Sequence, residues 1–295
     1  MAAIVACLSL TEPALADALT LRGDFTWESD DANLGGLSGL IVSADGLHLT
    51  AVSDAGWLYD ADVVRDDAGG IAALENVTAL HLRDNRKHPA EGFHANAEAL
   101  SRCGDGRVCV AFEGYARIAA FDPPDPLPQP LHVWDRFQAL WGNEGFEALA
   151  TLPDGRLIAI TEAGTEAGTY GVFLQQGNVW AGLAPLAAPD GYAATGADIG
   201  PDGRLYLLER RQGWSLRFQT RVRRFAVRPG GDGLPRFEDP ETLLETAPGD
   251  LDNMEGISLW TDTAGQPVIA MISDDNFFPW QSTRIVEYGL AEQRE

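Results

Sequence analysis

Lysine and long apolar runs are what this 295-residue sequence most clearly lacks. Its only lysine is Lys87, and 21 basic residues stand against 44 acidic ones, which gives a formal net charge of -23. Nucleic acids and anionic membrane surfaces bind cationic faces, so neither is expected to be the main partner. No apolar run reaches the roughly 18 residues that a membrane-spanning helix needs. The sequence therefore predicts a globular protein without a membrane span.

Cysteine is also scarce, with three in the whole chain. Residues 2–10 form a short apolar stretch, and the following Ala14-Leu15-Ala16 has the small residues that signal peptidase requires. We therefore predict a signal peptide over residues 1–16, a single domain over residues 17–295, and a periplasmic or secreted location. Cleavage before Cys7, as in a lipoprotein, is the alternative.

The two remaining cysteines lie close together in the sequence. Cys103 and Cys109 flank the tight-turn sequence Gly104-Asp105-Gly106-Arg107. Two cysteines on either side of a hairpin turn in an exported protein favour a disulfide. We predict that bridge, with two buried free thiols as the alternative.

Helix signals are few, and short apolar runs separated by turn dipeptides indicate an all-β fold. Asp-Gly turns recur at Asp45-Gly46, Asp105-Gly106, Asp154-Gly155 and Asp202-Gly203, each between two apolar runs. An Asp-Gly pair in that setting is a strong hairpin signal. The proline-rich residues 123–130 are expected to form a loop between strands.

Two columns of mostly acidic residues repeat along the chain. The first, on the first strand of each hairpin, consists of Ser38, Glu98, Glu147, Asp198 and Glu255. The second, at the end of each second strand, consists of Asp54, Glu113, Glu162, Glu209 and Asp274. Strands that repeat about every 50 residues are typical of a β-propeller. We predict five blades, with residues 19–27 pairing with residues 285–290 to close the ring. Six blades are the alternative, the sixth lying in residues 58–77 or assembled from the termini.

The motifs around these columns resemble those of a bacterial family called esterase-like activity of phytase. They are Gly35-Gly36-Leu37-Ser38-Gly39-Leu40, Val52-Ser53-Asp54, Asn96-Ala97-Glu98-Ala99-Leu100, Asn143-Glu144-Gly145-Phe146-Glu147-Ala148-Leu149, Leu208-Glu209-Arg210-Arg211, Asp252-Asn253-Met254-Glu255-Gly256-Ile257 and Ser273-Asp274-Asp275-Asn276-Phe277. The resemblance implies an exported protein with phytase-like phosphoesterase activity. The β-propeller phytases use several calcium ions at the top of the channel. A looser similarity to calcium-activated nucleotidases also implies a five-bladed propeller with an acidic, calcium-binding centre.

The acidic columns predict a metal site, because the first strand of each propeller blade lines the central channel. Carboxylates gathered there repel one another unless a cation binds or their pKa values rise. Calcium suits such a site, since it accepts six to eight oxygen ligands with flexible geometry. The predicted metal ligands are Glu98, Glu147, Asp198, Glu255, Asp54, Glu113, Glu162 and Asp275. In the alternative, these acids bind backbone amides of neighbouring blades and lock the ring.

Antiparallel pairing brings the second column to the same mouth of the channel. We predict catalytic roles there for Glu209, Arg210 and Asp274. A bound metal can polarise a phosphoryl oxygen and activate a water, while arginine binds the remaining phosphate oxygens. A salt bridge from Arg210 to an acid of the neighbouring blade is the alternative role for that residue.

Two functions therefore remain open at this point. The first is an exported, calcium-dependent phosphoric ester hydrolase, a monomer that acts on a small phosphorylated substrate. The second is a non-catalytic periplasmic propeller that binds a ligand or partner and uses a structural ring of acids.

Overall fold

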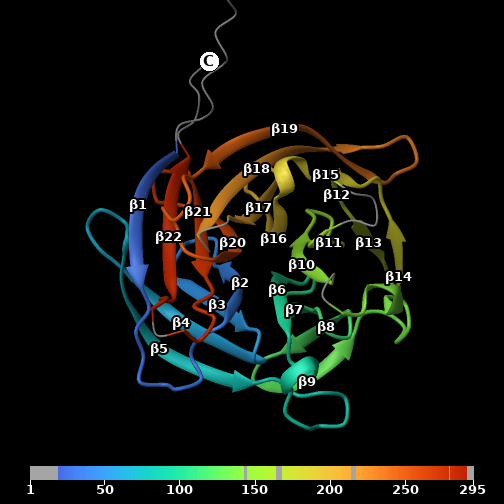
Figure 1. Ribbon diagram of the computed structural model, residues 1–295, viewed down its shortest axis with the longest axis horizontal. Coiled ribbons are helices and arrows are strands. Elements are labelled where there is room, and N and C mark those ends of the chain that lie inside the picture. Colours follow the sequence, from blue (N-terminus) through green and yellow to red (C-terminus); the bar gives the residue numbers. More distant parts are fainter. Residues whose placement is uncertain (1–18, 143–144, 164–167, 214–216, 279, 291–295) are drawn as a thin grey trace, which may run out of the picture.

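The computed structural model of the protein describes residues 19–142, 145–163, 168–213, 217–278 and 280–290. Five four-stranded antiparallel sheets surround a central axis, which confirms the predicted five-bladed β-propeller (Figure 1). The six-bladed alternative is wrong, because residues 58–77 belong to the two outer strands of the first blade. The predicted signal peptide, residues 1–16, lies outside the described residues.

Each blade begins next to the axis and ends at the rim (Figure 1). Blade 1 consists of β2 (Leu37–Val42), β3 (His48–Ser53), β4 (Trp57–Arg65) and β5 (Ile71–His81). Blade 2 consists of β6 (Ala97–Arg102), β7 (Val108–Phe112), β8 (Arg117–Asp122) and β9 (Asp125–Pro130). Blade 3 consists of β10 (Phe146–Thr151), β11 (Leu157–Thr161), β13 (Val172–Gln176) and β14 (Val179–Gly182).

The last two blades have longer strands. Blade 4 consists of β16 (Ala193–Ile199), β17 (Leu205–Gln212), β18 (Phe218–Pro229) and β19 (Pro235–Glu245). Blade 5 consists of β20 (Met254–Thr261), β21 (Pro267–Ser273), β22 (Arg284–Leu290) and β1 (Leu19–Thr26). β12 (Thr169–Tyr170), between β11 and β13 in the chain, pairs with β15 (Leu186–Ala187), which follows β14, in a two-stranded sheet. The short helices are η1 (Gly92–His94), η2 (Gln138–Leu140) and η3 (Pro189–Gly191).

The ring is closed by strands from opposite ends of the chain. β1 pairs antiparallel with β22, so that Leu19 lies opposite Leu290 and Thr26 lies opposite Arg284. This pairing confirms the predicted closure and covers what would otherwise be an open sheet edge.

The Asp-Gly turns connect the first two strands of blades 1 to 4, as predicted. Gly46 and Gly106 have φ angles of 73° and 90°, which a glycine adopts without steric cost. The Cys103–Cys109 disulfide is present and spans the β6–β7 hairpin. The proline-rich segment is not a loop, because residues 125–130 form the outermost strand β9. Proline has no backbone N–H to donate, and an edge strand tolerates this because only one of its sides is paired.

Five hydrophobic clusters form the core, and each lies between two adjacent blades. Ile160 of blade 3 packs in one cluster with Leu207 of blade 4, for example, and Val52 of blade 1 lies in another with Val110 of blade 2. Sheets packed in this way hold the inner strands firmly around the channel. Within the described part of the chain, no helix is both long and apolar enough to cross a membrane.

Candidate functional site

An inner ring of side chains is set by the same irregularity in every blade. The register between the first two strands of each blade skips one residue, which marks a β-bulge. Bulges of this kind redirect a side chain and are frequent beside active sites. The skipped residues are Ser38, Glu98, Glu147, Thr195 and Glu255.

An outer ring is formed by the residue that follows the second strand. Its backbone N–H bonds to the carbonyl two residues before the bulge residue, as from Asp54 to Gly36 at 2.8 Å. Glu113, Glu162 and Asp274 make the equivalent bond in blades 2, 3 and 5. In blade 4 the strand register places Arg210 opposite Ala193, so the corresponding side chain is a guanidinium.

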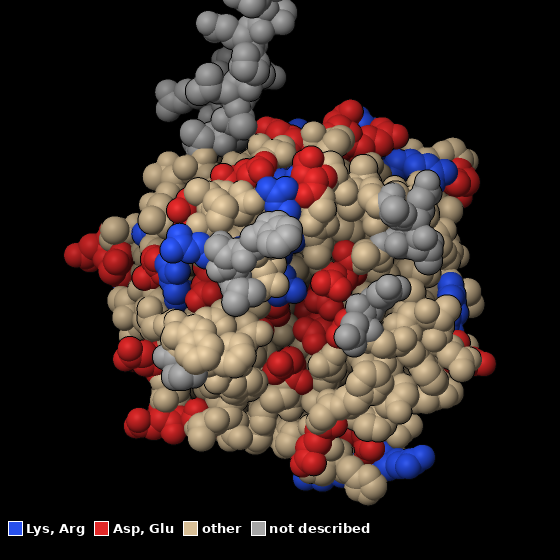
Figure 2. Space-filling model, viewed as in Figure 1, with Lys and Arg blue, Asp and Glu red and all other residues tan. Residues whose placement is uncertain are grey.

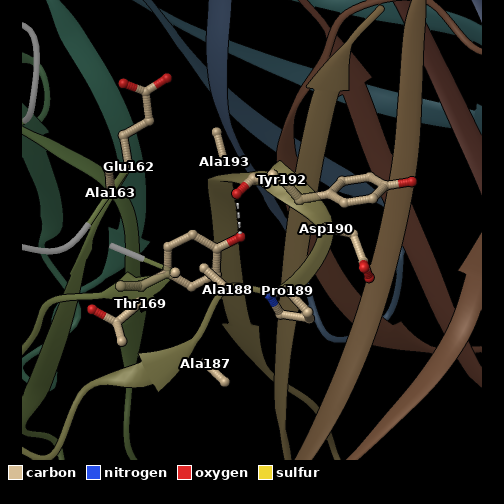
Figure 3. A pocket seen from close by; sticks show the side chains of 12 residues that line it. Glu162, Ala163, Thr169, Ala187, Ala188, Pro189, Asp190, Tyr192 and Ala193 are labelled. Carbon is tan, nitrogen blue, oxygen red and sulfur yellow. Dashed lines mark hydrogen bonds between the residues drawn. The ribbon is translucent and has the colours of Figure 1, made fainter. Parts of the chain in front are cut away.

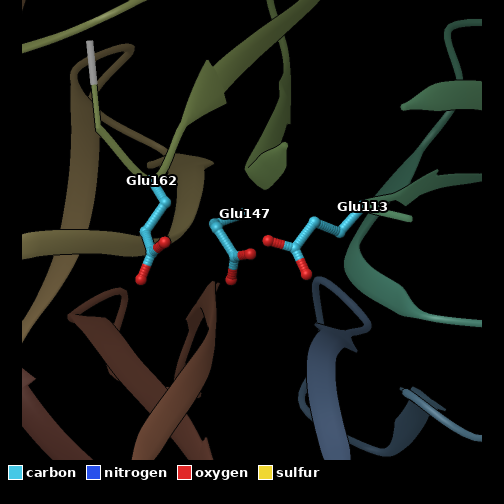
Figure 4. A group of neighbouring side chains, drawn as sticks. All are labelled: Glu113, Glu147 and Glu162. Atoms are coloured by element: carbon cyan, nitrogen blue, oxygen red, sulfur yellow. The ribbon is translucent and has the colours of Figure 1, made fainter. Parts of the chain in front are cut away.

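The two rings enclose a cavity of about 390 Å³ at one mouth of the channel. Its lining includes seven carboxylates and one arginine: Asp54, Glu98, Glu113, Glu147, Glu162, Glu255, Asp274 and Arg210. Figure 2 shows acidic side chains gathered in the hollow at the centre of this face. Carboxylate oxygens of Glu113, Glu147 and Glu162 lie within 4.8 Å of one another (Figure 4).

Burial and mutual repulsion raise the pKa values of five of these carboxyl groups: Asp54, Glu98, Glu113, Glu147 and Asp274. Burial is the main cause for Glu98 and Glu147, whose pKa values rise well above the usual range, and nearby carboxylates add to it. Burial and the charge of Glu255 raise the pKa of Asp54 to about 6 and that of Asp274 to about 8. A bound cation would offset the same repulsion.

Several oxygens in the cavity have no protein donor to stabilise them. Glu147 is 7% exposed, and its carboxylate accepts no hydrogen bond from the residues that the structure describes. Asp54 Oδ1 is buried without a hydrogen-bond partner in the described chain. Buried polar atoms are rarely left unpaired in native proteins, so a ligand for these oxygens is indicated. An all-carboxylate donor set fits a hard cation such as calcium.

Arg210 is the cation of the cavity. Its Nη1 donates to Oε1 of Glu255 and, over 2.5 Å, to Oδ1 of Asn253, and its Nη2 lies 3.9 Å from Oε1 of Glu162. The first contact is a salt bridge to the neighbouring blade, which was the alternative role predicted for this residue. The guanidinium nevertheless lines the cavity and remains partly exposed.

Asp198 is not part of this cluster, and its place in the inner ring is taken by Thr195. The Asp198 side chain lies three residues further along β16, where its Oδ2 accepts the N–H of Leu259 at 2.8 Å and the hydroxyl of Ser258 at 3.4 Å. It therefore joins blade 4 to blade 5. For this one acid, the structure corrects the predicted metal role and matches the structural alternative.

Glu209 does not reach the cavity either. It precedes Arg210 in β17, so its side chain points to the other face of the sheet. There it is fully buried and receives hydrogen bonds from Arg221 and Arg223 at 2.7–3.0 Å and from Tyr170 at 2.8 Å. The predicted catalytic role of Glu209 is corrected accordingly.

Asp275 lies beside the cavity without lining it. Its Oδ1 accepts the N–H groups of Gly36 and Phe277, each at 3.0 Å, and its Oδ2 accepts the hydroxyl of Thr283 at 3.2 Å. Asp275 thus ties the loop after β21 to blade 1.

Thr195 was not predicted as a member of the inner ring. One sequence signal could have indicated it: Thr195 precedes Gly196 just as Ser38 precedes Gly39.

Comparisons with known proteins agree with this architecture. None of the curated protein sequences matches the chain. Among solved structures, an α-L-arabinofuranosidase from Podospora anserina has a TM-score of 0.51 at 13% identity, over 92% of this chain and 97% of that one. A virginiamycin B lyase from Staphylococcus aureus has a TM-score of 0.43 at 11% identity, over 92% and 100%. At 13% identity, the similarity to the arabinofuranosidase concerns the fold alone.

The sequence comparison is more specific. The sequence model of a phytase-like family, described as esterase-like activity of phytase, matches residues 32–277. That range contains all ten positions of the two rings. The chain therefore belongs to this phytase-like family, and its membership indicates a hydrolase built on a β-propeller.

Proposed function

We propose that the protein is a calcium-dependent phosphoric ester hydrolase that acts on a small phosphorylated substrate in the acidic cavity. The observation that carries the proposal is the composition of the two rings. Blades 1, 2, 3 and 5 supply seven carboxylates, while blade 4 supplies the one arginine among the described lining residues. Cations and an arginine in one cavity are the groups that stabilise phosphoryl transfer in many enzymes.

Glu113, Glu147 and Glu162 would hold the first calcium ion, because their oxygens already converge. Asp54, Glu98 and Glu255 line the same cavity and would complete the oxygen shell or hold further ions. Calcium bound there would polarise a phosphoryl oxygen and lower the pKa of a bound water.

Arg210 would bind the phosphate oxygens, since a guanidinium can donate two parallel hydrogen bonds to them. Its present partners, Glu255 and Asn253, would orient it. Asp274 is the candidate proton carrier for the leaving oxygen. Its carboxylate lines the cavity and is held by the amide of Asn253 at 3.3 Å and the N–H of Asn276 at 2.6 Å.

We also propose that the protein acts as an exported monomer. The apolar N-terminal sequence ending at Ala16 supports export. The Cys103–Cys109 disulfide supports it too, because disulfides persist mainly in oxidising compartments. N-terminal sequencing of the secreted protein would test the cleavage after Ala16, and gel filtration would test the monomer.

The deciding experiment is metal analysis of the purified protein together with a phosphoester screen, with and without a chelator. Replacing Arg210 by Gln should lower kcat/KM about 10²–10³-fold, as loss of a charged transition-state contact does. Arg236→Gln is the matched control, because Arg236 lies on the outermost strand β19 and does not line the cavity. A protein that binds no calcium and cleaves no phosphoester would instead favour the non-catalytic binding propeller.

A further inference from the structure

A second cavity, of about 780 Å³, lies between blades 3 and 4 beside the acidic one (Figure 3). We call it the groove. Its wall consists mostly of small apolar residues, among them Ala163, Ala187, Ala188, Pro189 and Ala193. The volume falls within the range of about 300–1,000 Å³ that is usual for small-molecule sites.

The groove offers no positive charge to a ligand. No lysine or arginine is found among the described residues that line it, and its charged members are Glu162 and Asp190. In Figure 3, Glu162 lies at the upper left of the view and Asp190 at the right. A phosphate group placed here would meet two carboxylates and no basic side chain of the described lining, so an uncharged ligand is favoured.

Two buried arginines, Arg221 and Arg223, contact the wall of the groove. Arg221 and Arg223 are 3% and 4% exposed, and both bind Glu209. They also bind the carbonyls of Pro189 at 3.2 Å and Ala187 at 2.8 Å, and Nη1 of Arg221 lies 3.3 Å from Oδ2 of Asp190. These guanidinium groups therefore fix the wall of the groove and are not available to a ligand in it.

The floor of the groove is also preformed. Tyr170 is fully buried, and its hydroxyl lies 2.8 Å from both Oε1 of Glu209 and the carbonyl oxygen of Tyr192. The ring is held in place by these contacts, so the lining around it is already ordered and little conformational entropy is lost when a ligand binds.

Glu162 lines both cavities, so one ligand can occupy the two together. On the basis of the proposed function, we propose that the groove binds the uncharged aryl or alkyl part of a phosphomonoester whose phosphate lies in the acidic cavity. The substrate class is then an apolar phosphomonoester and not a polyphosphate such as myo-inositol hexakisphosphate.

The test compares 1-naphthyl phosphate with glycerol 3-phosphate and myo-inositol hexakisphosphate. The KM of the wild type should be at least about tenfold lower for the naphthyl ester than for glycerol 3-phosphate, a ratio that burial of about 55 Å² of apolar surface accounts for. Ala187→Asp places a charge in the groove and should raise the KM for the naphthyl ester by about tenfold and that for glycerol 3-phosphate by less than about twofold. Ala184→Asp is the matched control, since Ala184 is exposed three residues away and does not line the groove.

A binding measurement separates this inference from the proposed function. The wild type should bind 1-naphthol, which carries no phosphate, and Ala187→Asp should bind it about tenfold more weakly, as followed by naphthol fluorescence. Naphthol binding without hydrolysis of any phosphoester would support the groove and refute the proposed function. Hydrolysis without preference for the naphthyl ester, or naphthol binding unchanged in Ala187→Asp, would overturn the inference about the groove.

Discussion

Thr195 and Arg210 are the two residues at which blade 4 departs from the repeat. The other blades contribute seven carboxylates and Ser38 to the rings, whereas blade 4 contributes a hydroxyl and a guanidinium. Arg210 consequently provides one fixed cation in a cavity that is otherwise anionic. An anionic substrate can approach such a cavity only where Arg210, or a bound metal, offsets the repulsion.

Replacing Glu147 by Gln tests whether calcium binds to the carboxylates of the cavity. With calcium, the rise in melting temperature should be smaller than in the wild type, because one ligand charge is lost and ligand binding stabilises the native state by mass action. Without calcium, the variant should melt no lower than the wild type, since repulsion between carboxylates is relieved. Calorimetry with calcium and with chelator measures both.

Glu75→Gln is the control for this experiment, because Glu75 is exposed on β5, far from the two rings in the blade. A Glu147→Gln protein that melts higher than the wild type, with no response of either protein to calcium, would rule out the metal and the proposed mechanism.

The inner ring could be predicted from the sequence in four blades but not in blade 4. In the other four, the bulge residue is a serine or a glutamate set in closely similar motifs. Thr195 is not acidic, and Asp198 on the same strand offered an acid three residues away. Aligning the repeats on their acidic residues therefore selects Asp198, and only the β-bulge in the backbone identifies Thr195 as the inner-ring residue of blade 4.

At the scale of elements, the pair of strands β17 and β18 contains a buried ion network. Glu209 lies opposite Arg221 in the strand register, and Arg223 follows on the same face. Because side chains alternate along a strand, a shift of one residue moves a side chain to the opposite face. That is why Glu209 is buried while Arg210 lines the cavity. In the sequence, the signal for this buried acid is the pair Arg221 and Arg223, which are two residues apart and therefore lie on the same face of one strand.

Glu209→Gln should lower the free energy of unfolding by about 3–5 kcal/mol, because it leaves two buried guanidinium groups without their counter-charge. The loss should be the same with and without calcium, since Glu209 does not line the acidic cavity. Urea denaturation measures it. Glu238→Gln on β19 is the control, as its ion pair with Arg228 is exposed and should contribute less than about 1 kcal/mol. Equal losses in the two variants would contradict this account.

For the whole molecule, the sequence was sufficient to predict the number of blades and their closure. The repeat fixes the inner hairpins, and Leu19 and Leu290 lie in strands that had no other partner within their own segment. The outer strands were harder to predict, because they are partly exposed and their apolar alternation is weak. β9, with its prolines, is the clearest case.

The concentration of acids predicts how stability depends on pH in the calcium-free protein. The raised pKa values of Asp54, about 6, and Asp274, about 8, mean that the native state binds more protons than the unfolded state between about pH 4 and pH 8. The free energy of unfolding should therefore fall as the pH rises through this range, with Asp54 alone accounting for a loss of about 3 kcal/mol. Thermal melts in chelator across the range measure this.

Calcium should remove most of this dependence at neutral pH, since the ion takes over the role of the protons. Calcium-free protein whose melting temperature rises steadily from pH 5 to pH 8 would contradict the pKa values assigned to the two rings.

The pairing of β1 with β22 also determines when the molecule can be completed. During synthesis, β1 has no partner strand until β22 has left the ribosome. Contacts between such distant segments form slowly, because a long loop must close before they stabilise anything. A nascent chain of this protein therefore cannot close its ring until β22 has been synthesised.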